Sequence, residues 1–576
     1  MKIPFLASEG VTAPGLLDEV IPSFRRMLET RGGAVGTAIS DSLVAIRDLS
    51  ERKASQTLGN AKPFLDALDD QGASEAAAGL LGHSAPTNLV ARGVLDTIQP
   101  FVDRLAQNST VSGRGESLPA TPANLLASLE ARGSDFSALA QDGRQLIPFY
   151  LREGNRLMFR DLGLQHVTPL IDTLATQNST LGRIAQEGFN RVLYPDHYDN
   201  AFVNGLKALN TITLMGRAAI TNATQAAYPA IVAGLDPTVK AIAELSTSAG
   251  RDKLNKLFYD AGLAFDSSVS EYLNQDAGAS LLQRGASTLL KATGFESVER
   301  FNRLFSGAVA SNWIPQLVEQ AGRGSALAVK ELDRLGLRNI DALIQRGVTD
   351  DELHRGVQAF TRLTQFRVTP EELPMLASSQ WGKLLFQFKG FSLKATELLV
   401  DQLSDPQRAV QTALRVGTIL PLVGAPAEAF RRLVTRTQLA LPGAPPPPAT
   451  QETTTDPFRL NNALRDRDVS TLLKRYVEAV MVPGLGGIFY DSIKSAGYGT
   501  EGLYKMLLGP SVAQGVTLGA NVLKAVNPRE RNGIPVPFTD RAQPLAKQLL
   551  RDVPIIGPSL QQTYLPPPPN RRNPPQ

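Results

Sequence analysis

The chain has 576 residues, no cysteine and a net charge of only +4, from 59 basic and 55 acidic residues. The lack of cysteine excludes disulfides, thiolate metal sites and cysteine nucleophiles. No run of lysines and arginines is long enough to follow a phosphate backbone, so specific nucleic-acid binding is not expected, while non-specific contact with DNA stays open. The N-terminal apolar stretch is shorter than a secretory signal requires, and we predict none.

Helical spacing of apolar residues recurs along the chain, whereas strand signals are scarce. One stripe is formed by Val35, Ile39, Leu43, Ile46 and Leu49, and another by Val94, Ile98, Phe101, Val102 and Leu105. We therefore predict an all-α protein of about twenty helices. Its expected architecture is an elongated multi-helix assembly with a proline-rich linker and a proline-rich C-terminal tail.

Three threonines mark predicted helix starts. Thr121 precedes Pro122, which suits the first position of a helix. Thr349 with Glu352, and Thr369 with Glu372, both fit the capping box, in which the threonine and glutamate side chains each accept a backbone N–H of the other residue.

A weak repeat lies in the N-terminal third of the chain. Residues Ile98 to Arg114 resemble Val167 to Arg183, and both copies place Asn-Ser-Thr near their ends. That triplet suits the end of one helix followed by the cap of the next. With only two copies, the repeat predicts a duplicated helical hairpin and not a long solenoid.

Proline-rich stretches divide the C-terminal part of the chain. LPGAPPPPAT, from Leu441 to Thr450, predicts a stiff, extended spacer, and LPPPPNRRNPPQ, from Leu565 to Gln576, predicts a polar tail. Whether the tail is a frayed end or an arm that threads between subunits stays open. The predicted regions are 1–195 (N-terminal helical region), 196–440 (central helical domain), 441–456 (linker), 457–555 (C-terminal helical region) and 556–576 (tail).

No stretch reaches the length of an uninterrupted transmembrane helix. The nearest runs from Ala208 to Leu235 and carries one charge, Arg217, but it also contains many polar residues and Pro229, which should kink it. We interpret it as a pair of buried helices rich in small residues, with entry into a bilayer after rearrangement as the alternative.

The stretch from about Ser379 to Leu403 has the spacing of an amphipathic helix. Its apolar face is a candidate interaction ridge made of Trp381, Leu384, Leu385, Phe388, Phe391, Leu398 and Leu399. The opposite face mixes lysines with Glu397 and Asp401, whereas membrane-surface helices usually have a strongly basic face. The core of the same chain is therefore the first expectation for what covers the ridge, another subunit the second and a bilayer the third.

No residue pattern predicts a catalytic, cofactor or metal site, and we do not expect an enzyme. Asp196, His197 and Asp199 form the densest polar cluster, but near-adjacent side chains rarely converge on one metal ion. Glu296-Ser297 matches the catalytic Glu-Ser pair of lytic transglycosylases, without the downstream motif of that family. Glu296 also stands beside Glu299 on what we interpret as a solvated helix face.

Several stretches together resemble a known class of phage protein. Thr364 to Leu399 and Glu296 to Trp313 resemble a helical region of phage large polyvalent proteins and of internal virion (ejection) proteins of short-tailed phages. Leu206 to Ala227 and Val482 to Gly497 are similar to the flanks of that region. The resemblance covers residues 201–500 approximately and is one of pattern and order, without an active-site signature.

The resemblance implies a structural protein located inside the capsid near the portal, and in the host cell envelope after ejection. It implies a homo-oligomer that contacts the portal or other virion proteins and assists genome delivery, with contact to the host membrane and to DNA. A virion-associated peptidoglycan-cleaving enzyme, and a passive helical scaffold domain of a polyvalent protein, are the alternatives. No cofactor is implied.

Overall fold

The computed structural model describes residues 23–113, 116–131, 136–194, 224–264, 295–366, 369–373, 389–436, 530–531 and 534–535. The described residues form sixteen α-helices and two short two-stranded sheets, which confirms the all-α prediction. The chain divides into two compact units. The first unit contains Met1–Asn200, Ala233–Leu281 and Phe301–Gly382, so it joins the predicted N-terminal region 1–195 to two parts of the predicted central region 196–440.

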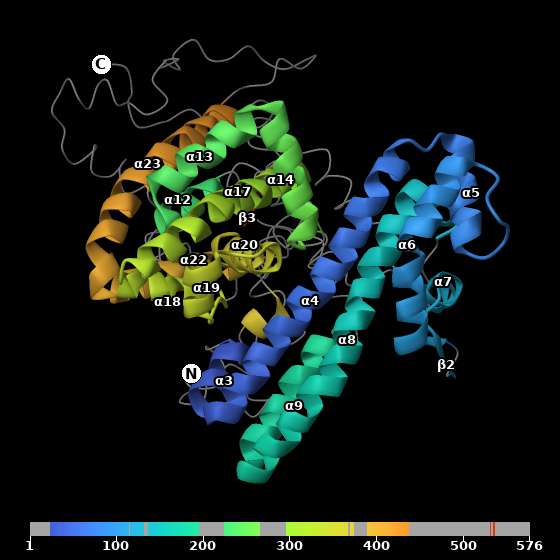
Figure 1. The fold of residues 1–576 in the computed structure, drawn as a ribbon, viewed down its shortest axis with the longest axis horizontal. Coiled ribbons are helices and arrows are strands. Elements are labelled where there is room, and N and C mark those ends of the chain that lie inside the picture. Colours follow the sequence, from blue (N-terminus) through green and yellow to red (C-terminus); the bar gives the residue numbers. More distant parts are fainter. Residues whose placement is uncertain are drawn as a thin grey trace. The chain divides into compact units, whose positions relative to one another are not determined.

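The N-terminal part of the first unit is a layer of helices with one small β-hairpin (Figure 1). Its elements are α3 (Phe24–Arg31), α4 (Gly33–Asp66), α5 (Asp70–Leu80), α6 (Leu89–Asn108), β1 (Thr110–Gly113), β2 (Glu116–Pro119), α7 (Pro122–Glu130), the 3-10 helix η2 (Leu139–Gln141), α8 (Gly143–Gln177) and α9 (Ser179–Leu193). The later part contains α13 (Leu235–Ser246), α14 (Ser248–Asp260), α17 (Phe295–Gly322, in this unit from Phe301), α18 (Ala326–Arg334), α19 (Ile340–Arg346), α20 (Asp350–Thr364) and the 3-10 helix η6 (Pro370–Glu372).

Two apolar clusters hold the N-terminal layer together. The first gathers side chains from α4 to α8, with Ile98, Phe101 and Tyr150 among its buried members. The second joins α3, α4, α8 and α9 around Phe24 and Phe189. Each large side chain buried in this way stabilises the fold by about 1.5–3 kcal/mol relative to exposure. Both clusters take their members from the chain before residue 195.

The predicted apolar stripes are largely confirmed. All five residues of the stripe that begins at Val94 are buried in α6. On α4, Ile39, Leu43 and Ile46 are buried, whereas Leu49 is exposed. Around Leu49, α4 buries the polar side chains of Arg47, Ser50 and Glu51 in place of apolar ones.

The two copies of the weak repeat end differently. The second copy behaves as predicted, because Asn178 ends α8 and its side chain accepts the N–H of Leu181 in the first turn of α9. The first copy leaves α6 at Asn108 and enters β1, which pairs antiparallel with β2. A second helix directly after Asn108 was the wrong expectation, since Thr110–Gly113 lacks apolar side chains at helical spacing and ends in a glycine.

Two of the three predicted helix starts are confirmed, and the third is wrong. Thr121 caps α7, and Thr349 and Glu352 form the full capping box of α20. The capping box predicted at Thr369 is wrong, since η6 spans three residues and its cap makes no side-chain hydrogen bond. The reason is that Glu371 and Glu372 form ion pairs with arginines of α4 and α3 instead of turning back to the cap.

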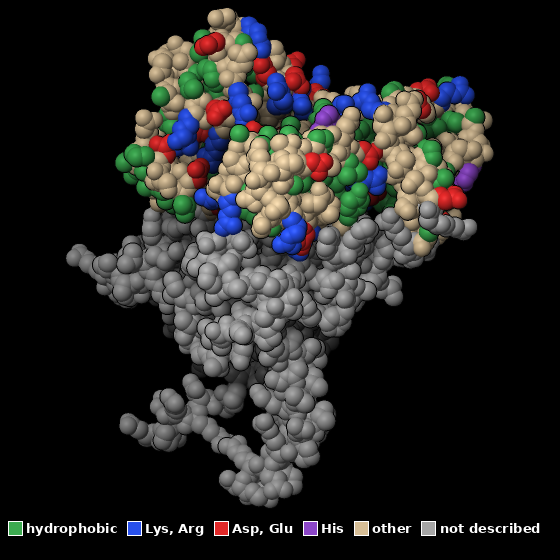
Figure 2. Space-filling model, turned by 90° about the horizontal axis from the view of Figure 1, so that it is seen from below, with side chains coloured by type: hydrophobic (Ala, Val, Ile, Leu, Met, Phe, Trp, Pro, Cys, Tyr) green, Lys and Arg blue, Asp and Glu red, His purple; other side chains and the backbone are tan. Residues whose placement is uncertain are grey.

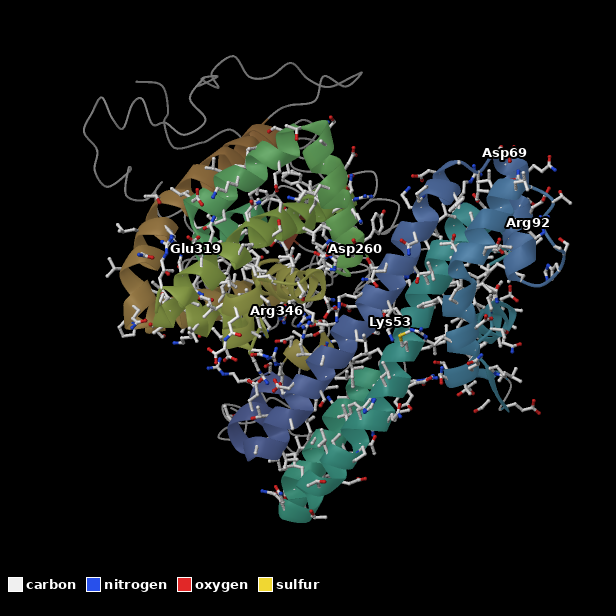
Figure 3. All side chains as sticks on the ribbon, viewed as in Figure 1. Lys53, Asp69, Arg92, Asp260, Glu319 and Arg346 are labelled. Carbon is white, nitrogen blue, oxygen red and sulfur yellow. The ribbon has the colours of Figure 1, made fainter. Side chains whose placement is uncertain are left out.

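Glu352 should make the stability of α20 depend on acid. Arg346, at the end of α19 (Figure 3), donates two hydrogen bonds of 2.7 and 2.9 Å to the Glu352 carboxylate. These bonds, with those from Thr349, lower the pKa of Glu352 from 4.5 to about 2. A lowered carboxyl pKa stabilises the folded state above pH 4.5, and this contribution is lost as the pH falls toward 2.

We therefore expect wild-type protein to lose its advantage in thermal stability over Glu352→Gln between pH 4.5 and pH 2. Melting temperatures measured by circular dichroism across this range would show the two curves converging. Curves that stay parallel would contradict the role given to the Arg346–Glu352 pair.

Phe366, which follows α20, has a left-handed backbone conformation with φ of 49° although its side chain is only 3% exposed. This conformation costs a non-glycine residue about 1–2 kcal/mol. We expect Phe366→Gly to be more stable than Phe366→Ala by about 1 kcal/mol, since both lose the ring but glycine tolerates this φ. Urea unfolding would measure the difference.

The matched control is Phe360, which lies inside α20. There the order should reverse, because glycine in a helix interior is less stable than alanine by about 1 kcal/mol. The same order at both positions would contradict the strain at Phe366.

The second unit contains the 3-10 helix η5 (Thr224–Ala226), α12 (Ala227–Ala233), α22 (Lys389–Ser404), α23 (Pro406–Arg436), β3 (Glu530–Arg531) and β4 (Ile534–Pro535). The described end of the predicted Ala208–Leu235 pair is α12, whose residues are buried and which contains Pro229 in its first turn. Residues 208–223 lie outside the described residues. No described helix is both long enough and apolar enough to cross a membrane.

Candidate functional site

Helix α4 buries polar as well as apolar side chains. Four buried residues, Ser40, Arg47, Glu51 and Ser55, recur at intervals of seven, four and four residues and therefore share one face of the helix. The apolar residues of α4 pack into the two clusters of the N-terminal layer. Figure 1 shows α4 running beside α8, with α14 on its other side. We call the polar face and its partners in the later part of the unit the α4 polar interface.

The centre of the α4 polar interface is a buried ion pair between Arg47 and Glu371 of η6. Nε and Nη2 of Arg47 donate to the two carboxylate oxygens of Glu371 at 2.5 and 2.9 Å. The Arg47 guanidinium carbon also lies 4.3 Å from the ring centroid of Phe159, in cation–π geometry. Arg47 is thus held between an apolar cluster on one side and a carboxylate on the other.

Helix α20 supplies the next contacts of this interface. Arg362 forms an ion pair with Asp48, and Nε2 of Gln358 donates to the Glu51 carboxylate at 3.3 Å. Closer to solvent, Arg52 pairs with Asp351 at 2.7 Å. Asp48, Glu51 and Arg52 of α4 therefore each contact an oppositely charged or hydrogen-bonding side chain of α20.

Glu372 of η6 and the adjacent Leu373 extend the interface to α3. Nη1 of Arg25 donates to Glu372 at 3.0 Å, and the backbone N–H of Phe24 donates to the Leu373 carbonyl at 3.0 Å. Burial disfavours the charged form of Arg25, but the carboxylates of Glu372 and Glu29 outweigh it and raise the pKa of the guanidinium. Arg25 therefore stays a permanent cation in this position.

The end of α14 packs against α4 by close backbone approach. Nε2 of Gln56 donates to the backbone carbonyl of Asp260 at 3.2 Å, at the end of α14 labelled in Figure 3. Gly262 follows with φ of 82°, and a Cβ there would lie 2.9 Å from Cγ of Arg52. Glycine is thus required at position 262 for both its conformation and its size.

Such an interface orients the helices more than it stabilises them. Desolvation offsets most of the Coulomb attraction of a buried ion pair, so the net stabilisation is small, although removal of one partner is costly. The charged side chains of an ion pair are also readily hydrated once the two partners separate. The members of the two apolar clusters, by contrast, all come from the N-terminal layer itself.

The predicted interaction ridge is only partly within the described residues. Leu398 and Leu399 lie in α22, and each is 3% exposed. Phe391 is also in α22, but its side chain is outside the described set, as are residues Trp381, Leu384, Leu385 and Phe388. The described end of the ridge is thus covered by the chain itself, and what covers the remainder stays a prediction.

The residues weighed for chemistry do not form a described site. Asp196, His197 and Asp199 lie outside the described residues, among which no group of three or more potential metal ligands occurs. Glu296 is in the first turn of α17, and its side chain is not described. Glu299 was expected on a solvated face, but it is buried, at 6% exposure.

Basic and acidic side chains are interspersed on the face shown in Figure 2, and neither sign gathers into a continuous patch there. This distribution agrees with the low net charge of the chain. The absence of specific nucleic-acid binding remains a prediction.

Sequence reasoning missed the α4 polar interface. Charged residues such as Arg47 and Glu51 on a helix normally indicate a solvated face, and their burial depends on partners more than 300 positions away. One local signal was present, since Glu371 and Glu372 form an acidic pair beside a proline turn. It was interpreted as a cap.

No protein-family model, curated protein or solved structure matches this chain.

Proposed function

We propose that this chain is an internal virion (ejection) structural protein of a short-tailed phage. In this proposal it multimerises near the portal or in the host envelope and assists genome delivery, with portal or other virion proteins, the host membrane and DNA as its contacts. The sequence resemblance over residues 201–500 suggests the class of protein.

The observation that carries the proposal is the α4 polar interface. A protein that leaves a capsid through a narrow channel has to separate its helical layers and rejoin them afterwards. Ion pairs such as Arg47–Glu371 and Arg52–Asp351 can part into water, whereas an apolar interface would aggregate once opened. The chain has no cysteine that could lock the layers together in a disulfide.

The test is to locate the chain in purified phage particles by mass spectrometry and by tag-directed electron microscopy, before and after ejection is triggered. The proposal expects the chain inside intact particles, near the portal, and its loss from particles that have ejected. A chain absent from particles would overturn the proposal.

Two assays of the purified protein separate the alternatives. Ring-shaped particles and leakage of dye from liposomes are expected for an ejection protein. Clearing of peptidoglycan in a zymogram, lost in Glu296→Gln, would support the cell-wall enzyme instead. A strict monomer that ignores liposomes would favour the passive scaffold domain.

A further inference from the structure

The segment Thr369–Leu373, which we call the η6 strap, packs against α3 and α9 of the N-terminal layer and forms two ion pairs with it. Glu371 pairs with Arg47 and Glu372 pairs with Arg25. The Leu373 carbonyl accepts one backbone hydrogen bond from Phe24. Arg25 of α3 and Arg47 of α4, which together we call the basic groove, thus bind the two consecutive glutamates of the strap.

The chain that leads into the strap is less favourably arranged. Phe366 has the left-handed φ of 49°. Both side-chain amide atoms of Gln365, and the hydroxyl of Thr369, are buried without a hydrogen-bond partner. Buried polar groups without partners and left-handed non-glycine residues both disfavour the conformation that contains them. The strap is therefore bound through two ion pairs, and a strained residue, Phe366, lies at the end of α20 before it.

We propose that the η6 strap exchanges between copies, so that the basic groove of one copy binds Thr369–Leu373 of a second copy. Exchange of an identical element remakes every contact of the groove and needs no new surface. Strain beside an exchanging segment favours this exchange, because Phe366 lies outside the strap and can leave its left-handed conformation when the strap leaves its own chain. The inference rests on the proposed function for its purpose, since strap exchange gives an internal virion protein a route to multimerise.

The partner is therefore a second copy of this chain, and the groove recognises it through charge. Arg25 and Arg47 face two consecutive carboxylates, and a copy of the same strap supplies those carboxylates at the right spacing. The Arg25–Glu372 pair is the better place for a test, because it is nearer to solvent than Arg47–Glu371 and tolerates substitution more readily.

The experiment uses two charge-reversed full-length variants, Arg25→Glu and Glu372→Arg. Each variant alone pairs like charges in the groove, whether the strap is its own or that of an identical copy. When the two are mixed and exchange straps, both grooves of the mixed dimer again contain one arginine and one glutamate. Analytical ultracentrifugation should then show dimer affinity about tenfold higher in the mixture than in either variant alone.

The double variant Arg25→Glu/Glu372→Arg is the matched control, since it restores opposite charges within one chain and shows that reversal is compatible with folding. It should dimerise as wild type does. Equal and undetectable dimerisation of the mixture, the double variant and the wild type would overturn strap exchange.

A second measurement does not depend on charge reversal. Because the chain has no cysteine, Arg25→Cys and Glu372→Cys variants with different tags can be mixed and treated with a short bismaleimide. Strap exchange predicts a covalent product that carries both tags. Asp41→Cys mixed with Arg338→Cys should give none, since these residues form an exposed ion pair between α4 and the chain after α18, outside the strap. Absence of the mixed-tag product, with efficient cross-linking inside the Arg25→Cys/Glu372→Cys double variant, would also overturn the proposal.

The experiments on strap exchange and on the proposed function can contradict one proposal without contradicting the other. Purified protein that never exchanges straps leaves the location of the chain in phage particles unaffected. A chain absent from particles can still exchange straps in solution.

Discussion

Replacing Glu371 by alanine should lower the free energy of unfolding of the first unit by about 3 kcal/mol. The substitution leaves the Arg47 guanidinium buried without the carboxylate that accepts two of its N–H groups. Oε1 of Glu51 lies 3.9 Å from Nη1 of Arg47, too far for a hydrogen bond, so it compensates only part of the loss. Urea unfolding followed by circular dichroism at constant salt would measure the change.

Two variants make this result specific to an unpaired buried charge. Glu372→Ala removes the carboxylate of the partly buried Arg25 pair, which is nearer to solvent than Arg47–Glu371, and should cost about 1 kcal/mol. The double variant Arg47→Met/Glu371→Leu removes both charges and should recover most of the lost stability, because apolar residues can replace a buried ion pair. A double variant as unstable as Glu371→Ala would show that packing, and not charge, governs this site.

Replacing Phe360 by alanine should destabilise the first unit by about 3–5 kcal/mol. Phe360 is fully buried in α20, and its ring centroid lies 5.3 Å from that of Trp313 on α17. Alanine leaves a cavity between these helices that the backbone cannot close, since Gly356 already brings α20 close to Ile314. The loss combines transfer of the ring to water with the cavity itself.

The control for this prediction is Phe64→Ala on α4, the same chemical change at a side chain that is 40% exposed. It should cost about 1 kcal/mol, because less apolar surface is lost and no closed cavity forms. Equal losses of stability at the two positions, measured by urea unfolding, would contradict the assignment of Phe360 to the core.

Helices that bury an apolar stripe could be predicted from the sequence because local spacing decides them. The stripe of α6 and the caps at Thr121 and Thr349 depend on residues within a few positions of each other. The prediction of a capping box at Thr369 was wrong because Glu371 and Glu372 bind arginines more than 300 positions earlier in the sequence. Local patterns carry no information about such partners.

The α4 polar interface could not be predicted for the same reason. Arg47 and Glu51, four residues apart, have the pattern of a solvent-exposed helical ion pair. Only the tertiary contact with η6 and α20 turns that pattern into a buried one. The candidate ridge from Trp381 to Leu399 rests on periodicity alone, and periodicity identifies a covered face without identifying what covers it.

Because α4 has an apolar face and a buried polar face, the number of codons that encode this helix cannot change freely. Each residue of an α-helix turns the chain by about 100°, so one codon inserted after Ile46 would rotate the rest of the helix by that angle. The side chains from Arg47 onward would then turn away from their ionic partners and toward the apolar clusters. Seven codons restore the orientation to within about 20°. Eleven codons do the same, so related genes are expected to lengthen or shorten this helix in blocks of seven or eleven codons.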